Sequence, residues 1–168
     1  AALASGLGVE AKTIADSLAY TTAAFGRVEK VKLGTKTVYL LLIKNPAGFT
    51  QIVETFLRGK ADQNVMIAIN DNPADGRDIS WLWDVPLEAI AVDKPRVITA
   101  GIRGADMALR LKYAGIDGVL TTSTQRGLQD LIEKTPEDGI AYILPTYTAM
   151  LEVRALLGKM TTLDEVWK

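Results

Sequence analysis

The sequence predicts an α/β domain built on a mostly parallel, doubly wound sheet that begins with a hairpin. The hairpin is predicted by an alternating segment at residues 28–33 and a continuously apolar one at residues 37–43, joined at Gly34-Thr35. After the hairpin, strand-like and helix-like segments alternate, which indicates parallel strands joined by right-handed crossovers. With 168 residues and a hydrophobic fraction of 48%, the chain is large enough for one full core.

The segment before the hairpin stands outside this alternation. Residues 9–24 place apolar side chains at a helical period, and Phe25-Gly-Arg27 ends the predicted helix at its glycine. We expect residues 1–26 to be the terminal helix and hinge of a preceding domain, and residues 27–168 to be the domain that follows. Because the chain starts with Ala-Ala-Leu-Ala and no methionine, we expect it to be part of a longer protein.

The remaining elements follow from apolar periodicity and from glycine stops. Strands are expected where short apolar runs are bounded by turn residues, and helices where apolar residues recur every three or four positions. Gly115 is expected to end one helix, because glycine readily adopts the left-handed conformation of a C-terminal cap. The expected strands are residues 65–69, 96–100, 118–121 and 140–144, and the expected helices are residues 49–57, 104–113, 124–134 and 146–157.

The composition excludes several classes of function. The net charge is −1, from 19 basic and 20 acidic residues, and no Lys/Arg cluster indicates a nucleic-acid partner. No apolar run is long enough for a transmembrane segment. The chain has no cysteine and no histidine, so it carries no thiolate zinc site, no cysteine nucleophile and no histidine base. Any Cys-His chemistry would therefore need a second polypeptide.

A polar loop at residues 70–78 follows a strand that is predicted to be buried. The carboxyl ends of strands are where open α/β sheets bind their ligands. Four carboxylates in and just after this loop are more than a turn needs: Asp71, Asp75, Asp78 and Asp84. Turn formation accounts for Asp71 and Asp75, because Asn-Pro follows the first and glycine follows the second.

The two later acids have different expected roles. Ser80 is expected to cap the aromatic segment at residues 81–84, and Asp84 to cap the segment after Val85-Pro86. Asp78 is then left without a structural role, which makes it the candidate functional acid of the loop.

A second candidate site lies between a buried strand and the next helix, at Lys44-Asn-Pro-Ala-Gly48. A lysine beside the backbone amides of a helix start suits phosphate binding. Alternatively, Asn45-Pro46 simply starts the helix, because proline is favoured in the first turn. No Walker A loop and no Gly-x-Gly-x-x-Gly motif occurs, and Gly101-Ile-Arg-Gly104 is interpreted as a turn that starts a helix, with Arg103 and Asp106 as an exposed pair.

Two tryptophans, Trp81 and Trp83, flank Leu82. They cannot share one face of a strand and both be core, so at least one is expected to meet a loop or a partner. Exposed tryptophan is typical of interface anchors. The alternative is that both pack against helices of this domain.

Several segments of the chain, taken together, carry a family resemblance. They are Phe25-Gly-Arg-Val-Glu29, Leu41-Leu-Ile-Lys-Asn-Pro-Ala-Gly-Phe49, the segment from Ile69 to Asp84, and Gly101-Ile-Arg with Leu109-Arg-Leu-Lys112. They resemble the C-terminal region of the MurT family, the Mur-ligase-like subunits of lipid II isoglutaminyl synthases. The Lys-Asn-Pro-Ala-Gly and Asp-Gly-Arg-Asp-x-Ser-Trp motifs are specific, since ordinary Mur ligases differ at both. The resemblance runs from the end of the central ligase domain almost to the last residue.

This resemblance implies a Rossmann-like domain and a part in an ATP-dependent amidotransferase. Such an enzyme amidates the α-carboxyl of D-glutamate in lipid II to D-isoglutamine, using ATP with Mg²⁺ and ammonia released from glutamine. A separate glutaminase subunit, GatD, carries a Cys and a His and completes a heterodimer. The implied complex is cytoplasmic and acts at the inner face of the membrane. Because the family's P-loop, central domain and zinc ribbon are not in this sequence, the chain alone is expected to be inactive.

The resemblance also implies roles for particular residues. Arg27 matches the arginine after the Mur hinge that lies near the nucleotide, and Lys44 and Asn45 match the strand-end segment that folds over ATP. Asp78 matches the aspartate thought to complete the glutaminase triad in trans. The composition agrees independently, because a chain with no Cys and no His can donate only an acid to a Cys-His-Asp set. No residue of this chain is expected to be a metal ligand.

Two other functions remain open at this point. The chain could be the C-terminal domain of another Mur-like ATP-dependent amide ligase, which would need no glutaminase. It could also be a non-catalytic domain that only docks the glutaminase, in which case Asp78 would be replaceable and Trp81 or Trp83 would not.

Overall fold

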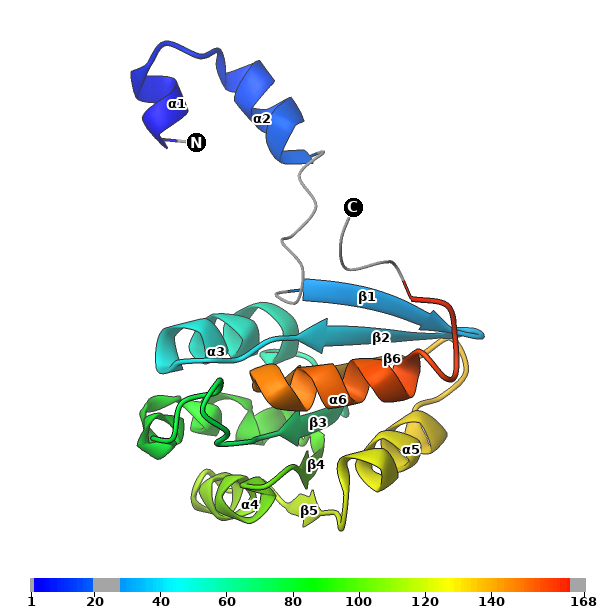
Figure 1. Cartoon of the computed structure of the whole chain (residues 1–168). Coiled ribbons are helices and arrows are strands. Elements are labelled where there is room, and N and C mark those ends of the chain that lie inside the picture. The colour runs from blue at the N-terminus through cyan, green and yellow to red at the C-terminus, as the bar shows by residue number, and fades with distance from the viewer. Residues whose placement is uncertain (1, 20–27, 164–168) are drawn as a thin grey trace.

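The computed structural model describes residues 2–19 and 28–163, and it contains a six-stranded sheet with helices on both faces (Figure 1). The strands are β1 (Val28–Leu33), β2 (Lys36–Leu41), β3 (Asn64–Ala68), β4 (Arg96–Ala100), β5 (Gly118–Leu120) and β6 (Ile140–Pro145). Their order across the sheet is β1-β2-β6-β3-β4-β5. All neighbours are parallel except β1 and β2, which form an antiparallel pair. The predicted doubly wound sheet with a hairpin is confirmed.

Helices fill the connections between these strands. The α-helices are α1 (Ala2–Gly6), α2 (Ala11–Ala19), α3 (Pro46–Ile52), α4 (Gly104–Tyr113), α5 (Thr124–Lys134) and α6 (Tyr147–Leu157). The π-helix η1 (Val53–Leu57) continues α3, and the 3-10 helices η2 (Ser80–Asp84) and η3 (Leu87–Asp93) join β3 to β4. The predicted helix at residues 9–24 begins at Ala11, and α1 before it was not predicted. The predicted hinge at Phe25-Gly-Arg27 lies outside the described residues.

The hairpin forms because its two strands differ in what they bury. Val31 on β1 faces Val38 on β2, and both are buried, whereas the neighbouring side chains of β1 are polar and exposed. This alternation is typical of a strand with one solvated face. A further contact joins β1 to α6, where Arg154 donates to the carboxylate of Glu29. The first strand is therefore fixed to the sheet by packing and by a partly buried ion pair.

The core lies in two layers, one on each face of the sheet. Along β3, Val65 and Ile67 pack with α3, η1, η2, η3 and α4, while Met66 and Ala68 pack with α5 and α6. All five residues of β3 are buried, as expected for a central parallel strand covered on both faces. Figure 1 shows α5 and α6 apart from the α3 and α4 layer.

The start of α3 differs from the prediction for a physical reason. The helix was expected from residue 49, but it begins at Pro46, because the Asn45 side chain caps it by accepting a hydrogen bond from Gly48 N at 2.8 Å. Proline is welcome at this first position, since its missing N–H would have no partner there. The helix then widens into η1, which closes where Arg58 N donates to Val53 O.

The carboxyl ends of β2, β6, β3, β4 and β5 meet at one edge of the sheet, because these strands are parallel. The chain leaves β3 toward the α3 and α4 face, and it leaves β6 into α6 on the opposite face. Neighbouring strands that send their connections to opposite faces create a crevice between them, which is the usual ligand position in open α/β sheets. The polar loop at residues 70–78 begins at this crevice.

Candidate functional site

The polar loop is attached to the start of α6 by a group of hydrogen bonds across the crevice. Asn70 N donates to Thr146 Oγ1 at 2.9 Å, and Thr146 N donates to Ala68 O at 3.0 Å. The Thr148 hydroxyl accepts from Asn70 Nδ2 at 3.1 Å and from Asn72 Nδ2 at 2.9 Å. The loop is therefore fixed in place by residues more than seventy positions further along the chain.

Asp75 is the main structural acid of this group. Its carboxylate accepts from Thr148 N at 2.7 Å, from Thr148 Oγ1 at 2.6 Å and from Asn72 N at 3.2 Å. The turn predicted at this position is present, because Asp75 N and Gly76 N both donate to Asn72 O, at 2.8 and 3.2 Å. A carboxylate on the first amides of a helix is favourable electrostatically as well as by hydrogen bonding. Asp75 thus closes the turn and caps α6 at the same time.

A second attachment runs from the loop to the turn before α4. Arg103 Nε lies 2.9 Å from Asp71 Oδ2, and Arg103 Nη1 lies 3.6 Å from Oδ2 of Asp106, the predicted partner. Asn70 Oδ1 accepts from Ile102 N at 2.9 Å. Gly101 has φ +86°, and a Cβ there would lie 2.5 Å from Ile69 O. Only glycine fits this position without strain, so β3 and β4 can end close together.

Asp78 is exposed, but it does have a structural role. Its Oδ1 accepts from Ser80 N at 2.8 Å, which satisfies the first amide of η2. The prediction that Ser80 caps this segment is wrong, because Asp78 accepts the hydrogen bond at its first amide. The assignment of Asp84 as a cap is also wrong, because η3 has no side-chain cap among the described residues. Aspartate often bonds the amide two residues on. The hydrogen bonds from the Ser80 side chain and backbone hold the pKa of Asp78 below its usual value, so it is ionised at neutral pH.

The predicted nucleotide residues lie at the same edge where they are described. Lys44 follows β2 and is exposed, and it forms no ion pair with any residue that the structure describes. The Asn45 side-chain oxygen is used to cap α3, which leaves its Nδ2 group without a hydrogen bond in the described part of the chain. Arg27 lies outside the described residues. The sheet brings Lys44, Asn45 and Asp78 to one edge without direct contact among them.

The two tryptophans are not both core. Trp81 is partly buried and packs edge-on against Phe49, with ring centroids 6.4 Å apart. Trp83 is 50% exposed and lies beside Tyr113, which is 71% exposed, at 5.4 Å. The guanidinium of buried Arg110 lies 5.6 Å from the Trp83 ring. Each tryptophan therefore packs against a helix of this domain, Trp81 against α3 and Trp83 against α4, as the alternative expected. A partner contact through the exposed part of Trp83, five residues after Asp78, stays a prediction.

A small cavity of about 380 Å³ opens at this edge. Sequence reasoning missed the hydroxyl residues around it, although the run of four hydroxyl residues directly after β5 could have signalled them. Its lining is mostly polar: Asn70, Asn72, Gly101, Ile102, Thr121, Thr122, Ser123, Thr124 and Glu152. Ser123 caps α5 by accepting from Arg126 N at 3.1 Å, and Thr124 donates to Glu152 at 2.9 Å. These groups can hydrogen-bond a small polar ligand but supply no nucleophile activated by a base.

The described residues contain neither a cluster of metal ligands nor a helix that could span a membrane. Within residues 2–19 and 28–163, no group of three or more acidic, histidine or cysteine side chains could hold a metal ion. In the same ranges, no helix is both long enough and apolar enough to cross a membrane.

Sequence comparisons match this chain to one family. A family model described as MurT ligase C-terminal matches residues 42–150. A curated relative, the lipid II isoglutaminyl synthase (glutamine-hydrolyzing) subunit MurT of Streptococcus pneumoniae, is 37% identical over 160 residues, which cover 94% of this chain and 36% of that protein. The subunit of the same name in Staphylococcus aureus (strain COL) is 30% identical over 155 residues, covering 91% and 35%. The chain spans about a third of the length of these relatives.

Structural comparisons show the same fold at low sequence identity. A pseudomurein peptide ligase type C from Methanothermus fervidus has a TM-score of 0.65 and 12% identity, covering 94% of this chain and 33% of that one. MurF ligase from Thermotoga maritima, solved in complex with ADP, has a TM-score of 0.61 and 11% identity, covering 95% and 35%. These likenesses establish a Mur-ligase-type Rossmann-like fold. Together with the family match and the curated relatives, they show that the chain belongs to the MurT ligase C-terminal family.

Proposed function

We propose that this chain is the C-terminal part of an ATP-dependent amidotransferase subunit and that it supplies Asp78 to the active site of a partner glutaminase. The complete enzyme would amidate the D-glutamate α-carboxyl of lipid II, with ammonia from a GatD-type subunit, on the cytoplasmic side of the membrane. The observation that carries the proposal is an ionised, exposed carboxylate fixed on a rigid loop, in a chain with no cysteine and no histidine. The relatives named above are subunits of a lipid II isoglutaminyl synthase whose name describes it as glutamine-hydrolyzing, which supports a glutaminase partner.

The role of Asp78 follows from its chemistry. In a Cys-His-Asp set, the acid accepts a hydrogen bond from the imidazole, selects its tautomer and stabilises the imidazolium. Asp78 is prepared for this role because Ser80 fixes its orientation and lowers its pKa while the carboxylate stays exposed. The attachment of the loop through Asp75 and Asn70 limits its movement, so an incoming histidine would meet the acid in one position. Positioning of this kind is a large part of catalysis.

We also propose that the carboxyl edge of the sheet closes over ATP, in a site shared with the rest of the subunit. The exposed ammonium of Lys44 at a strand end suits a phosphate, and Asn45 Nδ2 can donate beside it. Arg27 is proposed to approach the same nucleotide from the hinge. Bound ATP with Mg²⁺ would supply the driving force for amide formation. MurF ligase, which shares this fold, was solved in complex with ADP, and this supports nucleotide use by the complete subunit.

A second candidate function, a domain that only docks the glutaminase, is favoured by one observation. Trp83, which follows Asp78 in the connection from β3 to β4, forms an exposed aromatic pair with Tyr113 at the end of α4. Such pairs are frequent anchors of protein interfaces. If docking were the whole function, Trp83→Ala would abolish complex formation and Asp78→Asn would leave glutamine hydrolysis unchanged.

The test is glutamine hydrolysis by the complex reconstituted from the full-length subunit and its glutaminase. Asp78→Asn keeps the size of the side chain but removes the charge, and it is expected to lower kcat about 100-fold or more, since the equivalent change in a serine protease costs about 10⁴-fold. Asp84→Asn, which makes the same chemical change at an exposed acid six positions on, is the matched control and is expected to hydrolyse glutamine at the wild-type rate.

Complex formation by both variants should be measured separately, by analytical ultracentrifugation. If Asp78→Asn binds the glutaminase normally and hydrolyses glutamine as fast as Asp84→Asn, then Asp78 is not the triad acid.

A further inference from the structure

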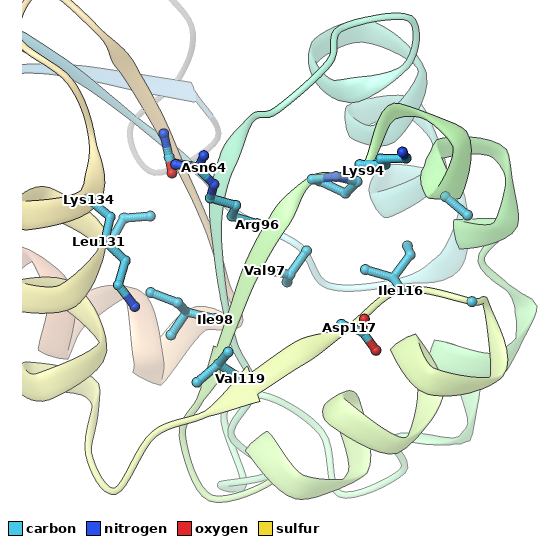
Figure 2. Close-up of a pocket in the computed structure, with 13 residues that line it drawn as sticks. Asn64, Lys94, Arg96, Val97, Ile98, Ile116, Asp117, Val119, Leu131 and Lys134 are labelled. Carbon is cyan, nitrogen blue, oxygen red and sulfur yellow. The ribbon is translucent and has the colours of Figure 1, made fainter.

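A second, larger cavity lies at the opposite edge of the sheet, where β3, β4 and β5 begin. Its volume is about 790 Å³, within the range of small-molecule sites. It surrounds the amino end of β4, and Figure 2 shows Leu131, Lys134 and Ile98 on one side of that strand and Lys94, Val97 and Ile116 on the other. Nothing in the proposed amidotransferase function uses this edge.

Three cations line this cavity, and none of them has an anionic partner in the part of the chain that the structure describes. Lys94 ends η3, Arg96 begins β4 and Lys134 lies in the last turn of α5. Among the described residues, none of the three forms an ion pair. The cavity has one acidic lining residue, Asp117. Three exposed cations facing one acid leave an excess of positive charge that suits an anion with two negative charges.

A buried amide points into the same space. Asn64 is only 6% exposed, and its side chain makes no hydrogen bond with the other described residues. Asn64 pairs in register with Arg96 on the neighbouring parallel strand, so the two side chains lie on the same face of the sheet. The polar atoms of Asn64 are not sealed from solvent, so its amide can donate a hydrogen bond to a ligand in the cavity.

The wall beside these polar groups is apolar. Ile98 and Leu131 are 5% and 1% exposed, and Val119 pairs with Ile98 in register on β5, which puts all three on the α5 face with Arg96. Figure 2 shows Lys134 directed toward Ile98 and Val119. The α5 side of the cavity therefore combines two cations, one amide and an apolar surface. This combination matches a charged head attached to an apolar body.

We propose that this cavity binds a phosphomonoester with an apolar body, its phosphate held by Arg96 and Lys134 and hydrogen-bonded by Asn64. Guanidinium groups bind phosphate through two parallel hydrogen bonds, and an ammonium adds a mobile point charge. Ile98, Leu131 and Val119 contact the body of the ligand. Lys94, on the other side of β4, raises the positive potential at the opening.

The test is calorimetric titration of the full chain with phenyl phosphate, inorganic phosphate and phenol at low salt. Phenyl phosphate is expected to bind saturably at one site and more tightly than inorganic phosphate, while phenol shows no binding. Arg96→Met and Lys134→Met should each weaken phenyl phosphate about 10-fold, the usual value of a hydrogen bond to a charged group. Lys112→Met, in the last turn of α4 and outside the cavity, is the matched control and should bind as wild type.

Asn64→Leu separates a binding role from a structural one. It should weaken phenyl phosphate binding about 2- to 10-fold. Its thermal unfolding midpoint should stay at or above that of wild type, because the lost amide has no hydrogen-bond partner among the described residues.

Vesicles of phosphatidylcholine with and without phosphatidic acid identify the source of the phosphate. Retention on phosphatidic acid vesicles that Lys134→Met abolishes assigns it to a lipid headgroup, whereas no retention assigns it to a soluble metabolite. The proposal is overturned if phenyl phosphate does not saturate, or if Arg96→Met and Lys134→Met bind it as well as Lys112→Met does.

Discussion

Replacing Asp75 should destabilise the domain far more than replacing Asp78, although the two acids are three residues apart. Asp75→Ala removes the acceptor of three hydrogen bonds, from Thr148 N, Thr148 Oγ1 and Asn72 N. A hydrogen bond to a charged group contributes about 1.5–3 kcal/mol, but Asp75 is only partly buried, so water replaces part of each loss. At about 1 kcal/mol for each bond, Asp75→Ala should lower the free energy of unfolding by about 3 kcal/mol.

For a chain of this size, about 3 kcal/mol corresponds to a fall in the thermal unfolding midpoint of about 6–12 °C. The assay is thermal unfolding of the full chain followed by circular dichroism, with Asp75→Asn, which keeps one acceptor oxygen, expected between Asp75→Ala and wild type. Asp78→Ala removes only a solvent-exposed cap and should unfold close to wild type. The reasoning is refuted if Asp75→Ala unfolds with wild type while Asp78→Ala unfolds well below it.

Three further predictions concern activity and pH. The purified chain alone should show no ATP turnover and no glutamine hydrolysis, because it has no P-loop, cysteine or histidine; turnover that follows the protein through purification would contradict this. In the full-length subunit, Lys44→Ala should raise the KM for ATP or lower kcat, and unchanged ATP dependence would leave Lys44 only a residue beside a helix start. The hydrogen bonds from Arg110 hold the pKa of folded Glu88 below its usual value. They therefore stabilise the folded state fully above the unfolded pKa of about 4.3, and this stabilisation is lost as pH falls through the lower folded pKa. The stability difference between wild type and Glu88→Gln, from urea unfolding, should therefore shrink below about pH 4, and a difference that grows there would contradict the assignment.

Much of the fold could be predicted because local pattern and tertiary environment agree. The alternating segment before Gly34 forms the edge strand β1, and the continuously apolar segment after it forms the inner strand β2, as their burial requires. The helix after Ser123 was predicted with its observed bounds, Thr124–Lys134, because its apolar period and its cap coincide.

The errors at the candidate site arose where two residues could do the same local task. Both Asp78 and Ser80 can cap a segment, and only the backbone conformation before η2 selects Asp78. The Asp75 carboxylate was correctly placed in a turn, but its bonds to Thr148 join residues 73 positions apart and leave no local signal. The amino-edge cavity could not be predicted either, since Asn64, Arg96 and Lys134 come from separate elements. The catalytic and nucleotide roles of Asp78, Lys44, Asn45 and Arg27 stay predictions.

The strand order has a consequence for how the chain is made. The inner position between β2 and β3 belongs to β6, which leaves the ribosome after the other five strands of this sheet. Until residues 140–145 emerge, β2 and β3 each expose an unpaired, apolar edge, and the hydrogen bonds from Thr146 and Thr148 that fix the polar loop cannot form. Exposed strand edges are the usual starting point of misassembly during synthesis. A nascent chain released before β6 would therefore carry both edges into solution, together with an Asp78 loop that is not yet attached. The synthesis of β6 and the start of α6 is thus the step that joins two halves of the sheet into one.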